Sequence, residues 1–238
     1  MKATSHPRRR LAVVTTLAAT FAALVAGWAQ PAAHADENPT LDTIYDAVGS
    51  THIGAQVDAD MPLGPTEIRV KLDLVTTNIV DGSLPIPSKV VNFDILGIPT
   101  RATVTMTQVG PVTGTITPIP GQRGKNVLVS KVAYDIRLSN VQARVFGIWW
   151  PLAVGSNCHT VDPVQIEART PEGEYFTVLA GGRVTDTYTI GSFTGCTPLN
   201  FFDIPGFFPT FGSIPINALV PGTDNTLSLT LSNPHAPA

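Results

Sequence analysis

Short runs in which apolar and polar residues alternate dominate this sequence, and they constrain its fold more than any other feature. The alternation is clearest over 67–74, 102–107, 164–169, 184–190 and 226–232. Side chains on a strand point to opposite faces in turn, so this period of two is typical of strands with one buried and one wet face. Many polar positions are threonine, whose β-branched side chain suits a pleated surface.

The longest strand is predicted over 127–138, where five apolar residues share one face: Leu128, Val132, Tyr134, Ile136 and Leu138. After Ser139-Asn140 the apolar positions become odd, at Val141, Ala143 and Val145. A β-bulge or a tight turn at Ser139-Asn140 would produce that change of face. The run ends at Trp149-Trp150-Pro151, since proline stops regular pairing.

One segment has helical spacing instead. Four apolar residues are spaced i, i+3, i+4 and i+7: Leu41, Ile44, Tyr45 and Val48. Pro39-Thr40 precedes them and Gly49 follows, which is typical of a helix start and stop. We therefore expect one short N-terminal helix over 40–49.

The fold class follows from these runs and from the residues between them. Glycine and proline number 20 and 21 among 238 residues, too many for regular helices elsewhere. The sequence predicts an all-β fold of about nine to eleven short, mostly antiparallel strands, as a β-sandwich or a partly closed barrel. We expect a single domain over 36–232 and a short disordered tail over 233–238. Two lobes joined within 151–163 are the alternative.

The first 35 residues look like a secretory signal peptide. Lys2 and Arg8-Arg9-Arg10 precede the uncharged apolar run 11–29, and Ala33-His34-Ala35 fits the cleavage pattern. The alternative is a membrane-anchoring helix, because nineteen residues just suffice to span a bilayer. We expect cleavage, no transmembrane anchor in the mature protein, and a secreted product that is extracellular or loosely attached to the envelope.

The charge of the mature chain argues against one class of partner. Cleavage after Ala35 would remove four of the fifteen Lys and Arg and none of the eighteen Asp and Glu, which leaves a net charge of −7. Nucleic-acid binding needs basic clusters, so we expect no nucleic-acid partner.

Both cysteines, Cys158 and Cys196, lie in the mature chain. An exported protein with an even cysteine count usually pairs them, so we expect a disulfide. The alternative is a catalytic thiol activated by His159. Adjacent residues of an extended chain point to opposite faces, which disfavours that pairing.

The sequence predicts no catalytic, cofactor-binding or metal-binding residue. It contains no Gly-x-Ser-x-Gly elbow, and the histidines of the mature chain, His52, His159 and His235, lie far apart. Asp58 and Asp60 would share one face of a strand, as a pair of glycosidase carboxylates or of calcium ligands requires. The segment Asp58-Ala59-Asp60-Met61-Pro62 is interpreted more simply as a turn.

The segment 199–220, which we call the plug segment, is the most unusual part of the chain. It holds five of the ten phenylalanines and one charged residue, Asp203. Its prolines and glycines disfavour regular structure. Either it plugs the open end of the core, or it forms a hydrophobic surface for a lipid, an envelope component or a protein. The residues of that possible binding surface are Phe201, Phe202, Phe207, Phe208, Phe211, Trp149 and Trp150.

Three segments carry a resemblance to a known grouping. They are 154–160 ahead of a strand led by Pro163, 187–196 ending in Phe193-Thr194-Gly195-Cys196, and 221–226 ahead of the last strand. Over about 150–232 the chain resembles exported β-rich proteins of unknown function from high-GC Gram-positive, actinomycete-type bacteria. The resemblance implies export and pairing of the two cysteines, and it implies no activity, ligand or catalytic residue.

These observations together predict a secreted, non-enzymatic protein that acts at or outside the cell envelope, by binding or as a structural component. The alternative is an extracellular carrier of a lipid or another apolar small molecule. A carrier requires that the plug segment line a cavity rather than cap a packed core.

Overall fold

The computed structural model describes residues 38–237, and the predicted signal peptide lies outside them. Within this range the chain is all-β, as predicted, with fifteen strands and two short 3₁₀ helices. The strands are β1 (Thr40–Ile53), β2 (Ala59–Pro62), β3 (Thr66–Asp73), β4 (Asn78–Ser83), β5 (Ile86–Ile95), β6 (Ile98–Pro118), β7 (Asn126–Val145), β8 (Ile148–Pro151), β9 (Cys158–Thr160), β10 (Val164–Arg169), β11 (Gly182–Ile190), β12 (Phe193–Thr194), β13 (Leu199–Asn200), β14 (Ser213–Ile214) and β15 (Gly222–His235). The helices are η1 (Phe201–Asp203) and η2 (Ile216–Ala218). The predicted number of strands, nine to eleven, was wrong because several short strands follow turns that the sequence did not reveal.

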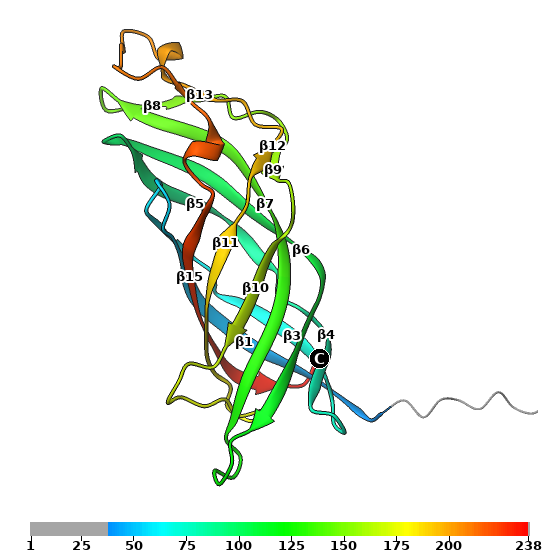
Figure 1. Ribbon diagram of the computed structural model, residues 1–238. Helices are drawn as coiled ribbons and strands as arrows, with labels where there is room; N and C mark the ends of the chain where they lie inside the picture. The colour runs from blue at the N-terminus through cyan, green and yellow to red at the C-terminus, as the bar shows by residue number, and fades with distance from the viewer. Residues whose placement is uncertain (1–37, 238) are drawn as a thin grey trace, which may run out of the picture. The chain divides into compact units, whose positions relative to one another are not determined.

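Strands β6 and β7 form the longest hairpin and organise the sheet (Figure 1). On its other side β7 pairs in succession with β10, β9 and β8. The strand pairings within 38–237 are antiparallel, which confirms that part of the prediction.

Eight strands close into a circuit, in the order β7, β10, β11, β15, β1, β3, β4 and β6, with β6 returning to β7. The circuit is weakest where β10 meets β11, since one residue pair, Arg169 with Thr185, joins them. Beside that pair the Asp186 carboxylate accepts a hydrogen bond from the backbone N–H of Glu167 at 2.8 Å. The sequence left two arrangements open, a β-sandwich and a partly closed barrel. The strand pairing is that of the partly closed barrel.

The core fills the inside of this circuit. The alternation of each predicted run places its apolar residues inward, and the buried members include Ile68, Val104, Ile166, Val184 and Leu229. Burial of these faces removes apolar surface from water, which is the main driving force for the fold.

The predicted N-terminal helix was wrong, because residues 40–53 form strand β1. This strand pairs with β15 on one side and with β3 and β2 on the other. Its inward residues Tyr45, Ala47, Thr51 and Ile53 are buried at a spacing of two, whereas Val48 is exposed. The helical spacing was fortuitous, and pairing with β3 from Thr40 and with β15 from Ile44 overrides it.

Gly49, predicted as the helix stop, is instead needed inside β1. A Cβ atom at this position would lie 2.0 Å from the Ser228 carbonyl oxygen of β15. Only glycine allows the two backbones to approach this closely.

The change of face at Ser139-Asn140 is a β-bulge, as predicted. The register moves from Thr103 opposite Ser139 to Arg101 opposite Gln142, so β7 has one extra residue there. Asn140 takes the positive φ of 51° that this conformation needs.

The C-terminal part of the chain is more ordered than predicted. Strand β15 extends through His235, so three residues of the predicted tail belong to the sheet, where Asn233 donates to the Asp46 carboxylate. Residues 38–237 belong to one compact unit. None of the helices within 38–237 has the length and hydropathy to cross a membrane.

Candidate functional site

The plug segment lies at one end of the strand circuit, and its part that joins β13 to β14 extends beyond β8 (Figure 1). It comprises β13, η1, β14 and η2 and the turns between them. One part of the segment is buried in the core, and another part faces solvent.

The buried part closes the core. Leu199, Phe201, Ile204, Ile216 and Leu219 are all buried. The ring of Phe201 meets that of Phe211 edge to face, with ring centres 5.2 Å apart. The plug interpretation is therefore confirmed for this part of the segment.

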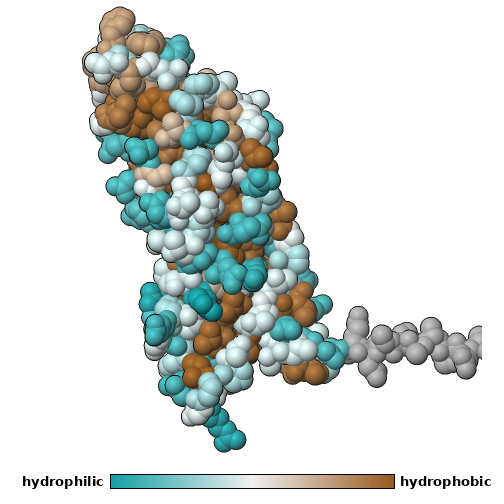
Figure 2. All heavy atoms as spheres, in the orientation of Figure 1, coloured by the Kyte–Doolittle hydropathy of each residue, from teal (hydrophilic) through white to brown (hydrophobic). Residues whose placement is uncertain are grey.

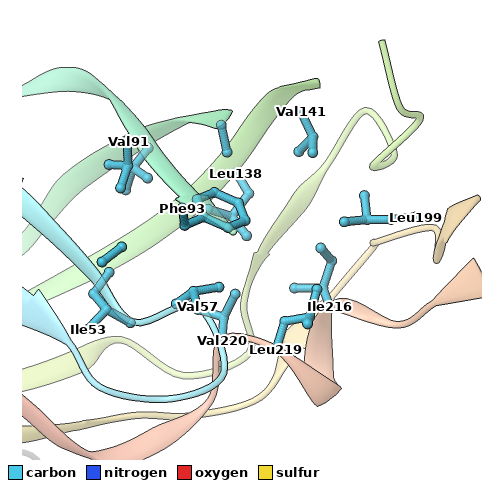
Figure 3. A pocket seen from close by; sticks show the side chains of 13 residues that line it. Ile53, Val57, Val91, Phe93, Leu138, Val141, Leu199, Ile216, Leu219 and Val220 are labelled. Atoms are coloured by element: carbon cyan, nitrogen blue, oxygen red, sulfur yellow. The ribbon is translucent and has the colours of Figure 1, made fainter. Parts of the chain in front are cut away.

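Between the plug segment and the strands lies a small apolar cavity. Leu199, Ile216, Leu219 and Val220 face Ile53, Val57, Val91, Phe93, Leu138 and Val141 across it (Figure 3). Its volume is about 40 Å³. Two further internal cavities measure about 20 and 40 Å³. Drug-sized ligands occupy pockets of about 300–1,000 Å³, so these volumes do not favour the carrier alternative.

Covalent and polar contacts fix both ends of the plug segment. Cys158 and Cys196 form the predicted disulfide, which lies just before the segment. Thr197 then donates its backbone N–H to Val154 and its hydroxyl to Ala153. Near the other end, the Asn217 side chain both accepts from the Phe193 N–H at 2.7 Å and donates to the Phe193 carbonyl at 3.0 Å.

The solvent-facing part of the segment exposes large aromatic side chains. Phe202 is 55% exposed and Phe208 is 86% exposed. Phe207 and Phe211 are half-buried. Of the five phenylalanines predicted as a binding surface, Phe201 alone is fully buried and belongs to the core.

Two hairpin tips add apolar side chains that the sequence did not single out. Leu96-Gly97 joins β5 to β6, and Phe146-Gly147 joins β7 to β8, each as a two-residue turn. Leu96 is 69% exposed and Phe146 is 72% exposed. Their φ values are 51° and 53°, and the glycines that follow have φ of 81° and 79°. These are the dihedral signs of a type I′ turn, in which asparagine is preferred at the first position.

A bulky side chain with positive φ is unusual, because its Cβ crowds the backbone. Both hairpins have such a residue at the same turn position, and in both it faces solvent rather than the core. Neither side chain contributes the burial that would compensate the crowding. Strained residues that persist in this way cluster at functional sites.

The two tips and the plug segment meet at one place. Strands β6 and β7 pair up to Thr100 and Ala143, so the turns beyond these residues are neighbours. The Phe146 ring meets the Phe207 ring edge to face, with centres 6.4 Å apart. Figure 2 shows hydrophobic side chains gathered over this end. We call this surface the apolar end, and its exposed members are Leu96, Phe146, Ile148, Phe202 and Phe208.

Other exposed apolar side chains lie elsewhere. Val75 and Leu179, for example, lie in the turns 73–77 and 177–181, away from the plug segment (Figure 1). Scattered surface residues of this kind are normal in soluble proteins, whereas a contiguous group indicates an interaction site.

The predicted pair Trp149 and Trp150 supports the apolar end from β8. The two side chains point to opposite faces, as predicted: Trp150 packs against the core, and Trp149 lies under the Arg101 guanidinium at 4.2 Å from the ring centre. Arg101 is held there by two hydrogen bonds to the Gln142 side-chain oxygen. The Trp150 Nε1 is buried and has no hydrogen-bond partner within 38–237.

Charges at the apolar end are few and balanced. The three segments that build it, 94–101, 142–151 and 199–214, contain Asp94, Asp203, Arg101 and Arg144. Their net charge is zero, whereas the stretch 38–237 has eleven Lys and Arg against sixteen Asp and Glu.

Asp58 and Asp60 are sequence neighbours of Val57 and Ala59, which line the small cavity under the plug segment. They flank His52, whose ring nitrogens are 3.4 Å from an Asp58 oxygen and 3.1 Å from an Asp60 oxygen. The predicted turn over 58–62 was wrong, because 59–62 form strand β2, in which Asp60 pairs with His52 of β1. The turn lies just before this strand, where the Asp58 N–H donates to the Ala55 carbonyl. In the part of the chain that the structure describes, no three His, Cys, Asp or Glu residues are grouped to hold a metal ion.

Two wider, open depressions lie elsewhere on the surface. One depression of about 480 Å³ covers the weak β10–β11 seam and is lined by Glu167, Arg169, Asp186 and several hydroxyl side chains. A second, of about 490 Å³, lies beside Lys125 and Tyr175. Neither has the mostly apolar lining with a few convergent polar groups that is typical of a small-molecule site.

Comparison with known proteins identifies no relative: no protein-family model, curated protein or solved structure matches the chain. The apolar end is therefore interpreted from its own geometry. The sequence carried a signal for its missed members, because Ile95-Leu96-Gly97-Ile98 and Val145-Phe146-Gly147-Ile148 have the same pattern of apolar residues around glycine.

Proposed function

We propose that this chain is an exported, non-catalytic protein that acts at or outside the cell envelope by binding, and that the apolar end is its binding surface. The observation that carries the proposal is that three separate segments place five exposed large apolar side chains at one end of the strand circuit, where Phe146 of one segment contacts Phe207 of another. A contiguous apolar surface of this kind marks an interaction site.

Two further observations support the proposal. The disulfide between Cys158 and Cys196 suits an oxidising compartment outside the cytoplasm. The plug segment is fixed at both ends by covalent and polar contacts, so Phe202 and Phe208 are presented from an ordered support. A binding surface that is ordered in advance loses less conformational entropy on association.

The proposal is tested by sedimentation of the purified protein with isolated bacterial cell envelopes. The test variant carries Phe202→Ser and Phe208→Ser, two exposed positions whose change leaves the core intact. The matched control is Leu179→Ser, which removes an equally exposed apolar side chain from another turn.

We expect the wild type and the control to sediment with the envelopes, and the double variant to stay in solution. Equal sedimentation of all three proteins, or none with any of them, would contradict the proposal.

A further inference from the structure

We infer that the partner of the apolar end is the interface of a phospholipid bilayer with little net charge, into which the two hairpin tips and the plug segment dock. The inference rests on the proposed function and names the partner class of that same surface. It is carried by the form of the surface, its area, its charges and its aromatic residues.

The form of the surface suits a deformable partner. Leu96 and Phe146 occupy the tips of tight turns and therefore project outward instead of lining a groove. The strands pair up to the last residue before each turn, Ile95 with Ile98 and Val145 with Ile148. Few backbone groups are thus left to be desolvated, which is the main penalty for bringing a chain into lipid.

The shape of the surface, more than its area, argues against a dimer. At roughly 150–250 Å² for a large side chain, the five exposed members present on the order of 600 Å². A stable protein interface buries about 800 Å² on each partner and requires close shape complementarity. Projecting tips on two copies do not provide such a match, whereas lipid chains adapt to them.

The charges complement a zwitterionic surface. Asp94, Asp203, Arg101 and Arg144 sum to zero, as do the phosphate and ammonium groups of phosphatidylcholine. The stretch 38–237 carries a net charge of −5, which opposes approach to a strongly anionic membrane. Docking therefore depends on apolar contact, and salt has little effect on it.

The aromatic residues behind the tips fit the same geometry. Trp149 and Trp150 lie three and four residues after Phe146, and Trp149 carries the Arg101 guanidinium on its face. Tryptophan is enriched where membrane proteins cross from lipid to water, and guanidinium groups bind phosphate. With Phe146 in the lipid, Trp149 and Arg101 would lie at the level of the headgroups, whereas Trp150 stays packed against the core.

The experiment is sedimentation with neutral phosphatidylcholine vesicles at low and high salt. The test variant carries Leu96→Asn and Phe146→Asn, which keep type I′ turns because asparagine tolerates positive φ. The control is Leu179→Asn. Unfolding midpoints of all proteins are recorded, and Phe208→Ser serves as a second test variant outside the turns.

We expect wild type and control to bind vesicles equally at both salt concentrations. Each removed apolar side chain should weaken partitioning on the order of tenfold. The turn variant should unfold no earlier than the wild type, so the loss is not a loss of fold.

Three results would overturn the inference. Wild type that binds cell envelopes but not vesicles would leave the proposed function standing and assign the surface to a wall polymer or a protein. Wild type that binds neither cell envelopes nor vesicles would overturn the proposed function as well. A dimer in solution that Leu96→Asn dissociates would assign the surface to a second copy of the chain.

Discussion

The Phe146 ring packs edge to face against the Phe207 ring, with ring centres 6.4 Å apart. This contact joins the β7–β8 hairpin to the plug segment, which are distant in sequence. Edge-to-face packing adds about 0.5–1.5 kcal/mol beyond the burial of the rings. Because of this contact the hairpin tip and the plug segment present a single surface.

Replacement of Leu96 by asparagine should stabilise the fold. Leu96 has a positive φ of 51° and is 69% exposed, so it crowds its own backbone without packing in the core. We expect Leu96→Asn to raise the free energy of unfolding by about 0.5–1 kcal/mol, measured by urea denaturation. A lower stability of the variant would mean that Leu96 makes packing contacts of its own. Phe146→Asn should bring a smaller gain, since it also loses the contact with Phe207.

Gly49 should tolerate no side chain. A Cβ atom there would lie 2.0 Å from the Ser228 carbonyl oxygen, so Gly49→Ala must push β1 and β15 apart. We expect a loss of about 1–3 kcal/mol in denaturant unfolding. Gly191→Ala is the matched control, because no atom lies within 4 Å of its added Cβ. Similar stabilities of the two variants would contradict the close approach of the strands.

Loss of the disulfide should loosen the plug segment. Cys158 and Cys196 close a loop with a sequence separation of 38, and the chain-entropy account gives about 4 kcal/mol for such a loop. We expect the Cys158→Ser, Cys196→Ser variant to unfold at lower denaturant and to be cut first by protease within 199–220. The native protein should be two hydrogen atoms lighter than its reduced form. Two thiols that react with an alkylating agent in the unreduced native protein would refute the pairing.

Loss of the Asn217 side chain should lower the free energy of unfolding more than loss of an exposed amide side chain. Its side chain satisfies both backbone groups of Phe193, and Asn217→Ala would leave both without that partner. We expect a loss of about 1–3 kcal/mol and faster hydrogen exchange over the plug segment. Gln165→Ala is the control, since the bond of Gln165 to Pro163 is exposed and local. Equal effects of both changes would show that Asn217 does not hold the plug segment.

Titration of Asp73 should make the free energy of unfolding depend on pH in the acid range. Hydrogen bonds from the Asn38 side chain and from the backbone N–H groups of Thr76 and Val75 lower the pKa of Asp73 to about 2. The pKa in the unfolded chain is about 3.9, so the carboxylate stabilises the fold above that pH, and this contribution is lost as the pH falls toward 2. We expect Asp73→Asn to be less stable than wild type at neutral pH, with the difference vanishing near pH 2. A difference that stays constant over this range would contradict the assignment.

Much of the fold was predictable from the sequence because burial has a local signature in a strand. The alternation at Ile68, Val104 and Leu229 identified their strands and inward faces correctly. The parity change at Asn140 likewise located the bulge. The helix prediction for 40–49 was wrong because the apolar spacing there fits a helix, and only the pairing with β15 and β3 makes the segment a strand.

Only part of the apolar end could be predicted from the sequence. Clustered phenylalanines with few charges drew attention to the plug segment, yet the sequence did not show that Phe201 is buried while Phe208 is exposed. Leu96 and Phe146 were missed because alternating runs hide a two-residue turn whose first residue is apolar. Their proximity depends on the pairing of β6 with β7, which is a tertiary contact.

The most direct test of the apolar end as the binding surface is hydrogen–deuterium exchange of the protein with and without phosphatidylcholine vesicles. We predict slower exchange over 94–99, 144–150 and 199–212, with no change in the polar depression at Thr185–Thr187. Slower exchange confined to that depression, or to the turns 73–77 and 177–181, would contradict the account.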